Sequence, residues 1–276
     1  MPYTAAIKPG QKVKLKDHDP DERGGMDKET GRLKTAELAK EIEELQELMF
    51  AARKHSLLLV FQGPDTGGKD GAINRVLSYL HAQTCRTTSF KVPTEEEASH
   101  DFLWRVHPHL PGKGGIAIFN RSHYEDVLVV RVHNLLPEKI WKKRYDVINE
   151  FETLAASNNT IILKFFLHIS KVEQEERLLA READPIKAWK LSLNDWKERE
   201  FWDEYIKAYE VALSKCSTAL APWRLVPANH KWFRDLAVAE AIADAMRPFR
   251  GEWTKELELL GKQAREELEA YRAESK

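Results

Sequence analysis

The stretch SLLLVFQGPDTGGKD, at residues 56–70, decides the fold. Its first seven residues form a short apolar run that ends at Gly-Pro, which is typical of a strand buried on both faces of a parallel sheet. Its last eight residues, 63–70, fit the pattern G-x-x-x-x-G-K and lead into a helical pattern over 70–80. This context favours a phosphate-binding P-loop over the alternative, a glycine-rich turn before an ordinary helix.

The P-loop predicts a cradle of backbone N–H groups for an anion. Glycines let consecutive N–H groups face one phosphate, and the N-terminus of the following helix adds partial positive charge. Lys69 supplies a mobile point charge to a phosphoryl oxygen. The predicted phosphate-binding residues are Gly63, Thr66, Gly67, Gly68, Lys69 and Asp70.

Two residues of this loop depart from the usual pattern. Asp70 stands where P-loop proteins carry a Ser or Thr that holds Mg²⁺, so it either joins the site or serves as a first-turn acid of the helix. Asp65 puts a carboxylate among phosphate-binding amides, where it would repel phosphate unless a cation lies between them. We therefore predict that Asp65 is the metal ligand, with Mg²⁺ as the ion and Mn²⁺ as the alternative.

A second polar cluster, NRSHYED at 120–126, follows the apolar run GIAIF at 115–119. The carboxyl ends of strands in open α/β sheets face the ligand, so Asn120 and Arg121 are expected to point at the phosphates. Glu125 and Asp126 are candidates for nucleotide or metal contacts, or are simply an acidic pair at a helix start. His123 is a candidate for substrate contact.

A third cluster follows the apolar strand pattern at 160–169 and contains four cationic residues. In P-loop kinases this region commonly forms a lid, whose arginines neutralise charge on a transferring phosphoryl group. The competing interpretation is a solvated helix face, because Glu173 and Arg177 have i,i+4 spacing. The cationic residues are Arg177, Arg181, Lys187 and Lys190.

Apolar strand patterns alternate with helical patterns along the whole chain, which predicts one α/β domain with a parallel sheet covered by helices on both faces. Further strands are expected at 86–92 and 223–227. Helices are expected at 35–53, 70–80, 95–106, 122–132, 137–156, 171–181, 194–214, 232–246 and 251–275.

Composition excludes several classes of protein. The 276 residues carry 43 Lys and Arg against 44 Asp and Glu, a net charge of −1, which argues against a nucleic-acid binder with a global basic field. No apolar stretch approaches the ~18 residues of a membrane span, and residues 1–4 open no secretory signal. The two cysteines form no disulfide framework or zinc motif, which favours a reducing, cytoplasmic setting.

Together these motifs resemble the polyphosphate kinase 2 family. The resemblance covers roughly residues 30–250 and rests on the following motifs: GPDTGGKDG at 63–71, FNRSHYEDVL at 119–128, KFFLHIS at 164–170, DPIKAWK at 184–190, APW at 221–223 and PAN at 227–229. It implies a thymidylate-kinase-like P-loop kinase fold with a helical lid. It also implies Mg²⁺-dependent phosphoryl transfer between inorganic polyphosphate and a nucleotide, and a homo-oligomer.

The resemblance further assigns roles to residues. Asp65 and Lys69 match the family's catalytic core, and Arg181 matches its lid arginine, with Arg177 one turn earlier. The better-known members end the second strand with Asp-Arg, whereas this chain has Asn120 and Arg121. That pair resembles the subgroup described as class III, which phosphorylates both nucleoside mono- and diphosphates.

The sequence thus predicts a polyphosphate:AMP/ADP phosphotransferase, with guanine nucleotides as further acceptors. Its predicted parts are an irregular arm (1–30), a kinase domain (31–250) with a lid at about 171–196, and a C-terminal helix (251–276). The first alternative is an ATP-dependent nucleoside monophosphate kinase on the same fold. The second is a nucleotide-binding regulatory switch, against which no Asn-Lys-x-Asp element is found. The predicted catalytic residues are Asp65, Lys69, Arg121, Arg177 and Arg181.

Overall fold

A six-stranded sheet forms the centre of the computed structural model, which describes residues 2–186, 189 and 191–274. The strands lie in the order β1-β6-β5-β2-β4-β3. Neighbours run parallel, except that β1 pairs with β6 in the antiparallel sense. The strands are β1 (Ala5–Ala6), β2 (Ser56–Gln62), β3 (Cys85–Ser89), β4 (Ile116–Asn120), β5 (Thr160–His168) and β6 (Trp223–Pro227). The predicted α/β class and parallel sheet are confirmed.

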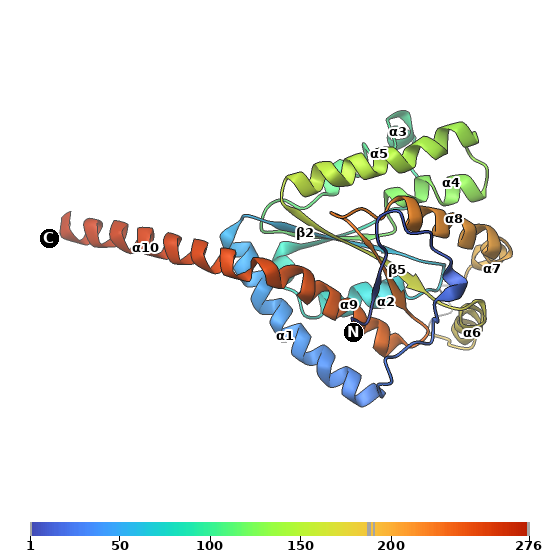
Figure 1. Cartoon of the computed structure of the whole chain (residues 1–276), viewed down its shortest axis with the longest axis horizontal. Coiled ribbons are helices and arrows are strands. Elements are labelled where there is room, and N and C mark those ends of the chain that lie inside the picture. The colour runs from blue at the N-terminus through green and yellow to red at the C-terminus, as the bar shows by residue number, and fades with distance from the viewer. Residues whose placement is uncertain (1, 187–188, 190, 275–276) are drawn as a thin grey trace.

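Helices cover both faces of this sheet (Figure 1). One layer contains α1 (Lys28–Ala52), α2 (Lys69–Leu77) and α9 (Lys231–Met246), and the other contains α4 (Val129–Val132), α5 (Glu138–Ser157) and α8 (Trp202–Lys215). The shorter helices are α3 (Glu95–Ser99), α6 (Lys171–Glu182) and α7 (Leu193–Glu200).

Strand β2 shows why the sheet needs both layers. Its residues alternate between two apolar cores, with Leu57 and Leu59 in the core beneath α1 and α9 and Leu58 and Val60 in the core beneath α5. Every residue of the strand is buried, which accounts for its continuous apolar sequence. Because β2 lies between β4 and β5, the carboxyl ends of three central strands meet where the P-loop begins.

The N-terminal residues, which were predicted to form an irregular arm, pack against the core of the protein. They contain β1, and Ile7, Val13 and Leu15 are buried in the core. Helix α1 also begins at Lys28, seven residues before the start that the apolar period predicts. The Asp27 side chain caps this helix by accepting a hydrogen bond from the Thr30 N–H, and the first turn is too exposed to carry an apolar pattern.

Three predicted helices are shorter or interrupted. The helix predicted at 95–106 ends at Ser99, and the helix predicted at 122–132 is a 3₁₀ turn (His123–Asp126) followed by α4. The helix predicted at 194–214 is divided into α7 and α8 at Phe201. All three segments carry apolar residues at helical spacing, and this spacing alone does not show where each helix ends.

The last helix, α10 (Arg250–Glu274), starts in contact with the core through the buried Trp253 and then extends away from the body of the protein (Figure 1). Its second half is exposed to solvent. Among the described residues, no helix is long and apolar enough to cross a membrane.

Candidate active site

The P-loop turns sharply between β2 and α2 because its glycines permit close backbone approach. Gly68 has φ +92°, and a Cβ atom on Gly67 would lie 2.7 Å from the Pro64 carbonyl oxygen. Thr66 holds φ +60° without being glycine, a conformation that is costly for a β-branched residue. Strain of this kind is typical of ligand-binding loops.

Lys69 folds over the loop from the first position of α2. Its Nζ atom donates hydrogen bonds to the carbonyl oxygens of Gly63 (2.7 Å) and Pro64 (3.0 Å) and lies 4.0 Å from Asp65 Oδ1. Burial lowers the pKa of the ammonium group, and the Asp65 carboxylate opposes that shift. Both hydrogen-bond partners of the ammonium group are thus neutral carbonyl groups, which leaves much of its charge available to an anion.

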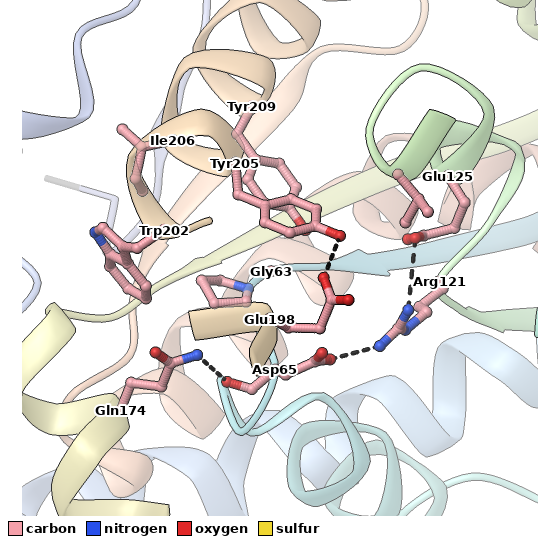
Figure 2. Close-up of a pocket in the computed structure, with 12 residues that line it drawn as sticks. Gly63, Asp65, Arg121, Glu125, Gln174, Glu198, Trp202, Tyr205, Ile206 and Tyr209 are labelled. Atoms are coloured by element: carbon pink, nitrogen blue, oxygen red, sulfur yellow. Dashed lines mark hydrogen bonds and ion pairs between the residues drawn. The ribbon is translucent and has the colours of Figure 1, made fainter. Parts of the chain in front are cut away.

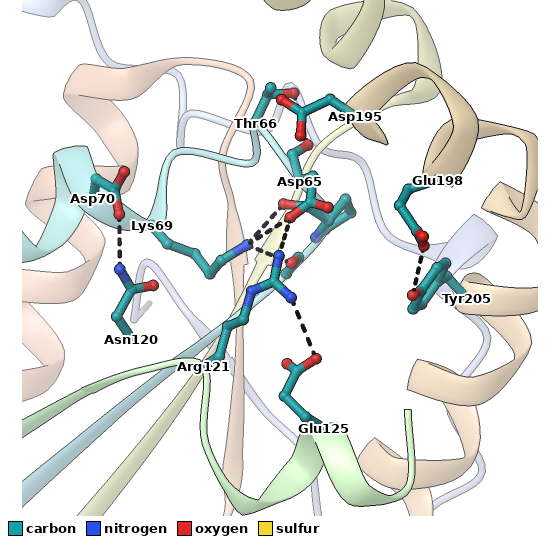
Figure 3. A network of polar contacts seen from close by, with 12 residues as sticks. Asp65, Thr66, Lys69, Asp70, Asn120, Arg121, Glu125, Asp195, Glu198 and Tyr205 are labelled. Carbon is teal, nitrogen blue, oxygen red and sulfur yellow. Dashed lines mark hydrogen bonds and ion pairs between the residues drawn. The ribbon is translucent and has the colours of Figure 1, made fainter. Parts of the chain in front are cut away.

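Arg121 lies between two carboxylates at the end of β4 (Figure 3). Its Nη2 atom donates to Asp65 Oδ1 at 2.5 Å, and its Nη1 atom lies 3.5 Å from Glu125 Oε2. Burial lowers the pKa of Arg121, but Glu125 and Asp65 outweigh burial and raise it overall. Burial raises the pKa of Glu125, and Arg121 opposes that shift. The strand end thus presents a fixed cation to the P-loop, as predicted.

Two adjoining pockets meet at Asp65 and Arg121. The phosphate pocket is lined by Asp65, Thr66, Gly68, Lys69, Asp70, Asn120, Arg121, Arg181 and Asp195. The aromatic pocket is lined by Gly63, Pro64, Asp65, Arg121, Glu125, Val129, Gln174, Glu198, Trp202, Tyr205, Ile206 and Tyr209 (Figure 2). One pocket is rich in charge and backbone amides, whereas the other offers flat rings from α8.

The residues at this junction fit a divalent ion held jointly by protein and substrate. Mg²⁺ usually takes one or two carboxylates together with substrate phosphates and waters. Asp65 offers one carboxylate beside the loop, and Glu125 lies on the other side of Arg121. Within residues 2–186, 189 and 191–274, no group of three or more His, Cys, Asp or Glu side chains could hold a metal alone. The donor set therefore suits an ion that arrives with a phosphate chain.

The two arginines predicted to belong to a lid, Arg177 and Arg181, differ in where they point. Arg181 of α6 lines the phosphate pocket and donates to Asp195 Oδ2 at 2.7 Å. Arg177 instead donates to the carbonyl oxygens of Thr66 (3.1 Å) and Ala228 (2.6 Å) and is absent from the lining of both pockets. Arg177 thus holds the backbone of the loop, whereas Arg181 reaches the phosphate pocket, and a catalytic role for each of them stays a prediction.

Asn120 and Asp70 are joined across the phosphate pocket. The Asn120 Nδ2 atom donates to Asp70 Oδ1 at 2.7 Å, which links the end of β4 to the first turn of α2 (Figure 3). Asp70 is therefore both a first-turn acid of α2 and part of the pocket wall, so the two roles left open for it coexist.

His123 and Asp126 are not brought into either pocket. His123 is fully buried, and its Nε2 atom lies 3.3 Å from Glu152 Oε1. Asp126 accepts a hydrogen bond from Arg144 Nη1 at 2.8 Å. The predicted substrate contact of His123 is thus corrected to a core contact, because the turn after β4 faces inward there. Asp126 is only partly buried, and it pairs with Arg144 outside the two pockets. Lys187 and Lys190 lie outside the described residues.

Several residues at the site were missed from the sequence. Arg234 of α9 is 3% exposed and donates to the Gly68 carbonyl oxygen at 3.1 Å, and Gln174 donates to the Asp65 carbonyl oxygen at 2.9 Å. No local pattern marks either residue. The aromatic wall had a readable signal, since Trp202, Tyr205 and Tyr209 are spaced i, i+3, i+7 and so share one helix face.

A parallel sheet with a P-loop at its central strand and a lysine, a carboxylate and arginines around a phosphate pocket defines a P-loop protein of the kinase type. The sequence model of the family Polyphosphate kinase 2 (PPK2) matches residues 25–251, and the chain belongs to this family. The resemblance drawn from the motifs is confirmed.

Relatives and a solved structure agree with this assignment. The chain is 46% identical over 242 residues to the AMP/ADP-polyphosphate phosphotransferase of Meiothermus ruber, which covers 87% of this chain and 91% of that protein. It is 44% identical over 221 residues to the ADP-polyphosphate phosphotransferase of Rhodopseudomonas palustris, with 76% of each chain covered. The crystal structure of polyphosphate kinase 2 from Arthrobacter aurescens TC1 is similar with a TM-score of 0.85 and 41% identity over 88% of each chain.

Proposed function

We propose that this protein transfers the terminal phosphoryl group of inorganic polyphosphate to AMP and ADP, giving ADP and ATP. The observation that carries the proposal is the junction of the phosphate pocket with the aromatic pocket at Asp65 and Arg121. The relatives named above act, by their names, on polyphosphate with AMP or ADP, and this supports the same substrates here.

The two pockets suit two different substrate parts. The P-loop amides and Lys69 suit the terminal phosphates of the donor. The aromatic pocket offers Trp202, Tyr205 and Tyr209, whose flat rings suit a nucleoside. The acceptor's own phosphate would then lie at the shared wall, beside Arg121, where the attacking oxygen meets the donor.

The reaction requires positioning and charge stabilisation more than proton transfer. A nucleotide phosphate oxygen attacks the terminal phosphorus, a new P–O bond forms, and the anhydride P–O bond breaks to leave polyphosphate one unit shorter. The attacking oxygen is already ionised, so no strong general base is needed. Lys69, Arg121 and Arg181 stabilise charge on the transferring group.

A divalent ion belongs to this chemistry, and we propose Mg²⁺, with Mn²⁺ as a substitute. Asp65, with Glu125 nearby, would hold it. When bound, such an ion neutralises charge on the phosphate oxygens of donor and acceptor.

The direct test is to mix the protein with long-chain polyphosphate, AMP and Mg²⁺ without ATP. ADP and then ATP should form, and parallel reactions with ADP, GMP and GDP define the acceptors. An ATP-dependent kinase would form ADP only when ATP replaces polyphosphate. A regulatory switch would bind nucleotide tightly and transfer nothing. Either outcome would overturn the proposal.

Three further features of the protein stay predictions: the lid, the oligomeric state and the location in the cell. We propose that residues 171–196 act as the lid, since Arg181 of α6 and Asp195 of α7 both line the phosphate pocket. A homo-oligomer is expected, and light scattering would measure its size. A cytoplasmic location is also expected, and the two unpaired cysteines, Cys85 and Cys216, fit a reducing compartment.

A further inference from the structure

A basic hollow lies behind the P-loop, outside the two pockets of the active site. Its cationic side chains come from three helices that are distant in sequence. The hollow is lined by Lys28, Arg32 and Thr35 of α1, Arg75 of α2, Asn229, His230, and Lys231, Trp232 and Asp235 of α9. None of these lining residues belongs to either pocket of the active site.

The charge of this hollow is poorly neutralised. Lys28, Arg32 and Arg75 are exposed, and their side chains form no ion pair or hydrogen bond with any described part of the chain. The carboxylate in the hollow, Asp235, is already engaged, because Arg234 donates to its Oδ1 atom from Nε (2.9 Å) and Nη2 (2.6 Å). The cations that line the hollow outnumber its lining carboxylate, Asp235, which Arg75 also attracts, and this excess of positive charge favours a ligand with several negative charges.

The start of α2 links the two places, because Gly68 lines the phosphate pocket and Arg75 lines the hollow. Gly68, Gly71 and Arg75 are spaced i, i+3, i+7, so they lie along one face at the start of α2. Both glycines lie against Arg234: added Cβ atoms would be 2.4 Å from its Nη1 at Gly68 and 3.3 Å from its Nη2 at Gly71. The helical rise places Arg75 ~10 Å beyond Gly68 along this face of α2.

The hollow suits phosphates better than a nucleobase. Arginine forks bind phosphate oxygens in a planar, bidentate manner, and Arg32 and Arg75 are both available for this. The ring in the hollow, Trp232, is partly occupied, because its edge packs so close to Gly31 that a Cβ there would lie 2.3 Å from its Cζ3. A base would therefore find little free aromatic surface to stack on.

We propose that the basic hollow is a second polyanion site, which holds phosphates of the polyphosphate chain distal to those in the P-loop. The chain would run from Gly68 along the start of α2, so the site contacts only donors long enough to reach Arg75. This proposal rests on the proposed function for the identity of the polyanion. The site adds affinity for long donors and takes no part in the transfer step.

The test compares wild type with the double variant Arg32→Ala/Arg75→Ala, using Arg265→Ala/Arg272→Ala on the exposed end of α10 as a control with equal charge loss. Equilibrium binding of long-chain polyphosphate and of tripolyphosphate is measured for each protein, together with KM for the long chain. The dissociation constant for the long chain should rise about tenfold, or about 1.4 kcal/mol, in the hollow variant alone. Its salt dependence should also weaken, because fewer counterions are released.

The tripolyphosphate arm separates a distal site from a general defect. Tripolyphosphate is too short to fill both sites, so its binding should change by less than about twofold. Equal weakening of both ligands, or no change for the long chain, would overturn the second site. If wild type binds long polyphosphate with this arginine dependence but transfers nothing to AMP or ADP, the proposed function fails while the hollow stands.

Discussion

Two buried lysines on neighbouring elements of this protein, Lys69 and Lys164, have opposite surroundings. Lys164 in β5 is fully buried, and its Nζ atom donates to Glu152 Oε2 (2.6 Å), Tyr124 Oη (2.9 Å) and the Cys216 carbonyl oxygen (2.5 Å). Lys69 is 8% exposed, and its close partners are two neutral carbonyl groups. Its nearest carboxylate oxygen, on Asp65, is 4.0 Å away.

This difference shows that a buried lysine can have a structural role at one position and a functional role at another. The ammonium group of Lys164 uses all three of its donors on protein acceptors, one of them a carboxylate, so its charge is neutralised in place. The charge of Lys69 is only partly compensated, which costs stability and leaves an attraction for phosphate. Tyr124 connects the two regions, because it lies in the turn that carries Arg121 and Glu125 to the site.

The largest expected effect is on catalysis, in Lys69→Ala. Loss of a cation that stabilises the transferring phosphoryl group should lower kcat/KM with polyphosphate and AMP by about 10³–10⁴-fold, or about 4–5.5 kcal/mol. The melting temperature should stay the same or rise, because burial disfavours the charged lysine in the folded state. Turnover near that of wild type, or a large loss of stability, would show that Lys69 does not have a functional role distinct from the structural role of Lys164.

The converse experiment is Lys164→Met. Removing one partner of a buried pair leaves the Glu152 carboxylate uncompensated, so the free energy of unfolding should fall by about 3–5 kcal/mol. The double variant Lys164→Met/Glu152→Leu should recover part of that loss, since no unpaired charge remains. Chemical denaturation of the three proteins measures this. A single variant as stable as wild type would show that Lys164 contributes no structural ion pair.

The role of a residue could be predicted from the sequence when its partners lie close to it along the chain. Asp65 and Lys69 were readable because a P-loop is defined by spacing within eight residues. Arg177 and Arg181, one helical turn apart, could not be told apart, because only packing against the Ala228 carbonyl decides which one faces the loop. Arg234 was missed since its partner, Gly68, lies 166 positions away.

Elements of the fold could likewise be predicted where nearby residues determine them. The strand at 56–62 was predicted to the residue, because burial on both faces leaves a continuous apolar run. His123 was misassigned because its partner Glu152 is on α5, and nothing in the motif at 120–126 indicates that this turn faces inward. Strand β1 has only two residues and carries too little pattern to be seen.

A smaller effect should appear as a pH dependence of stability. Burial raises the pKa of Glu152, but Lys164 and His123 outweigh burial and lower it overall. A carboxylate whose pKa is lowered by folding stabilises the folded protein. This contribution is complete above the pKa of the group in the unfolded chain, about 4.3, and is lost as the pH falls through its pKa in the folded protein. Thermal unfolding from pH 6 to pH 3 should therefore show an acid limb that is shallower in Glu152→Gln.

The absence of any difference in slope between Glu152→Gln and wild type would contradict this assignment. Lys69 provides the internal comparison, because its pKa shift is also a lowering but concerns a cation. Because the pKa of Lys69 is lowered in the folded protein, this lysine should make the folded protein more stable as the pH rises toward the pKa of lysine in the unfolded chain, about 10.4. Lys69→Ala should accordingly leave the acid limb unchanged.

The smallest expected effect is at Asn120, which lines the phosphate pocket together with Lys69. Its side chain is half-exposed and donates one hydrogen bond, to Asp70 Oδ1 at 2.7 Å. Asn120→Ala should cost about 0.5–1.5 kcal/mol of stability or transition-state binding, so kcat/KM should fall by about two- to tenfold.

Asn120→Asp replaces the donor by a carboxylate facing Asp70. Like-charge repulsion should make it the more damaging variant unless a divalent ion is shared between the two carboxylates. Titration of Mg²⁺ with both variants separates these cases: a rise in Mg²⁺ affinity confined to Asn120→Asp would show that the end of β4 is close enough to the ion to ligate it, whereas unchanged affinity in both would confine the ion to Asp65.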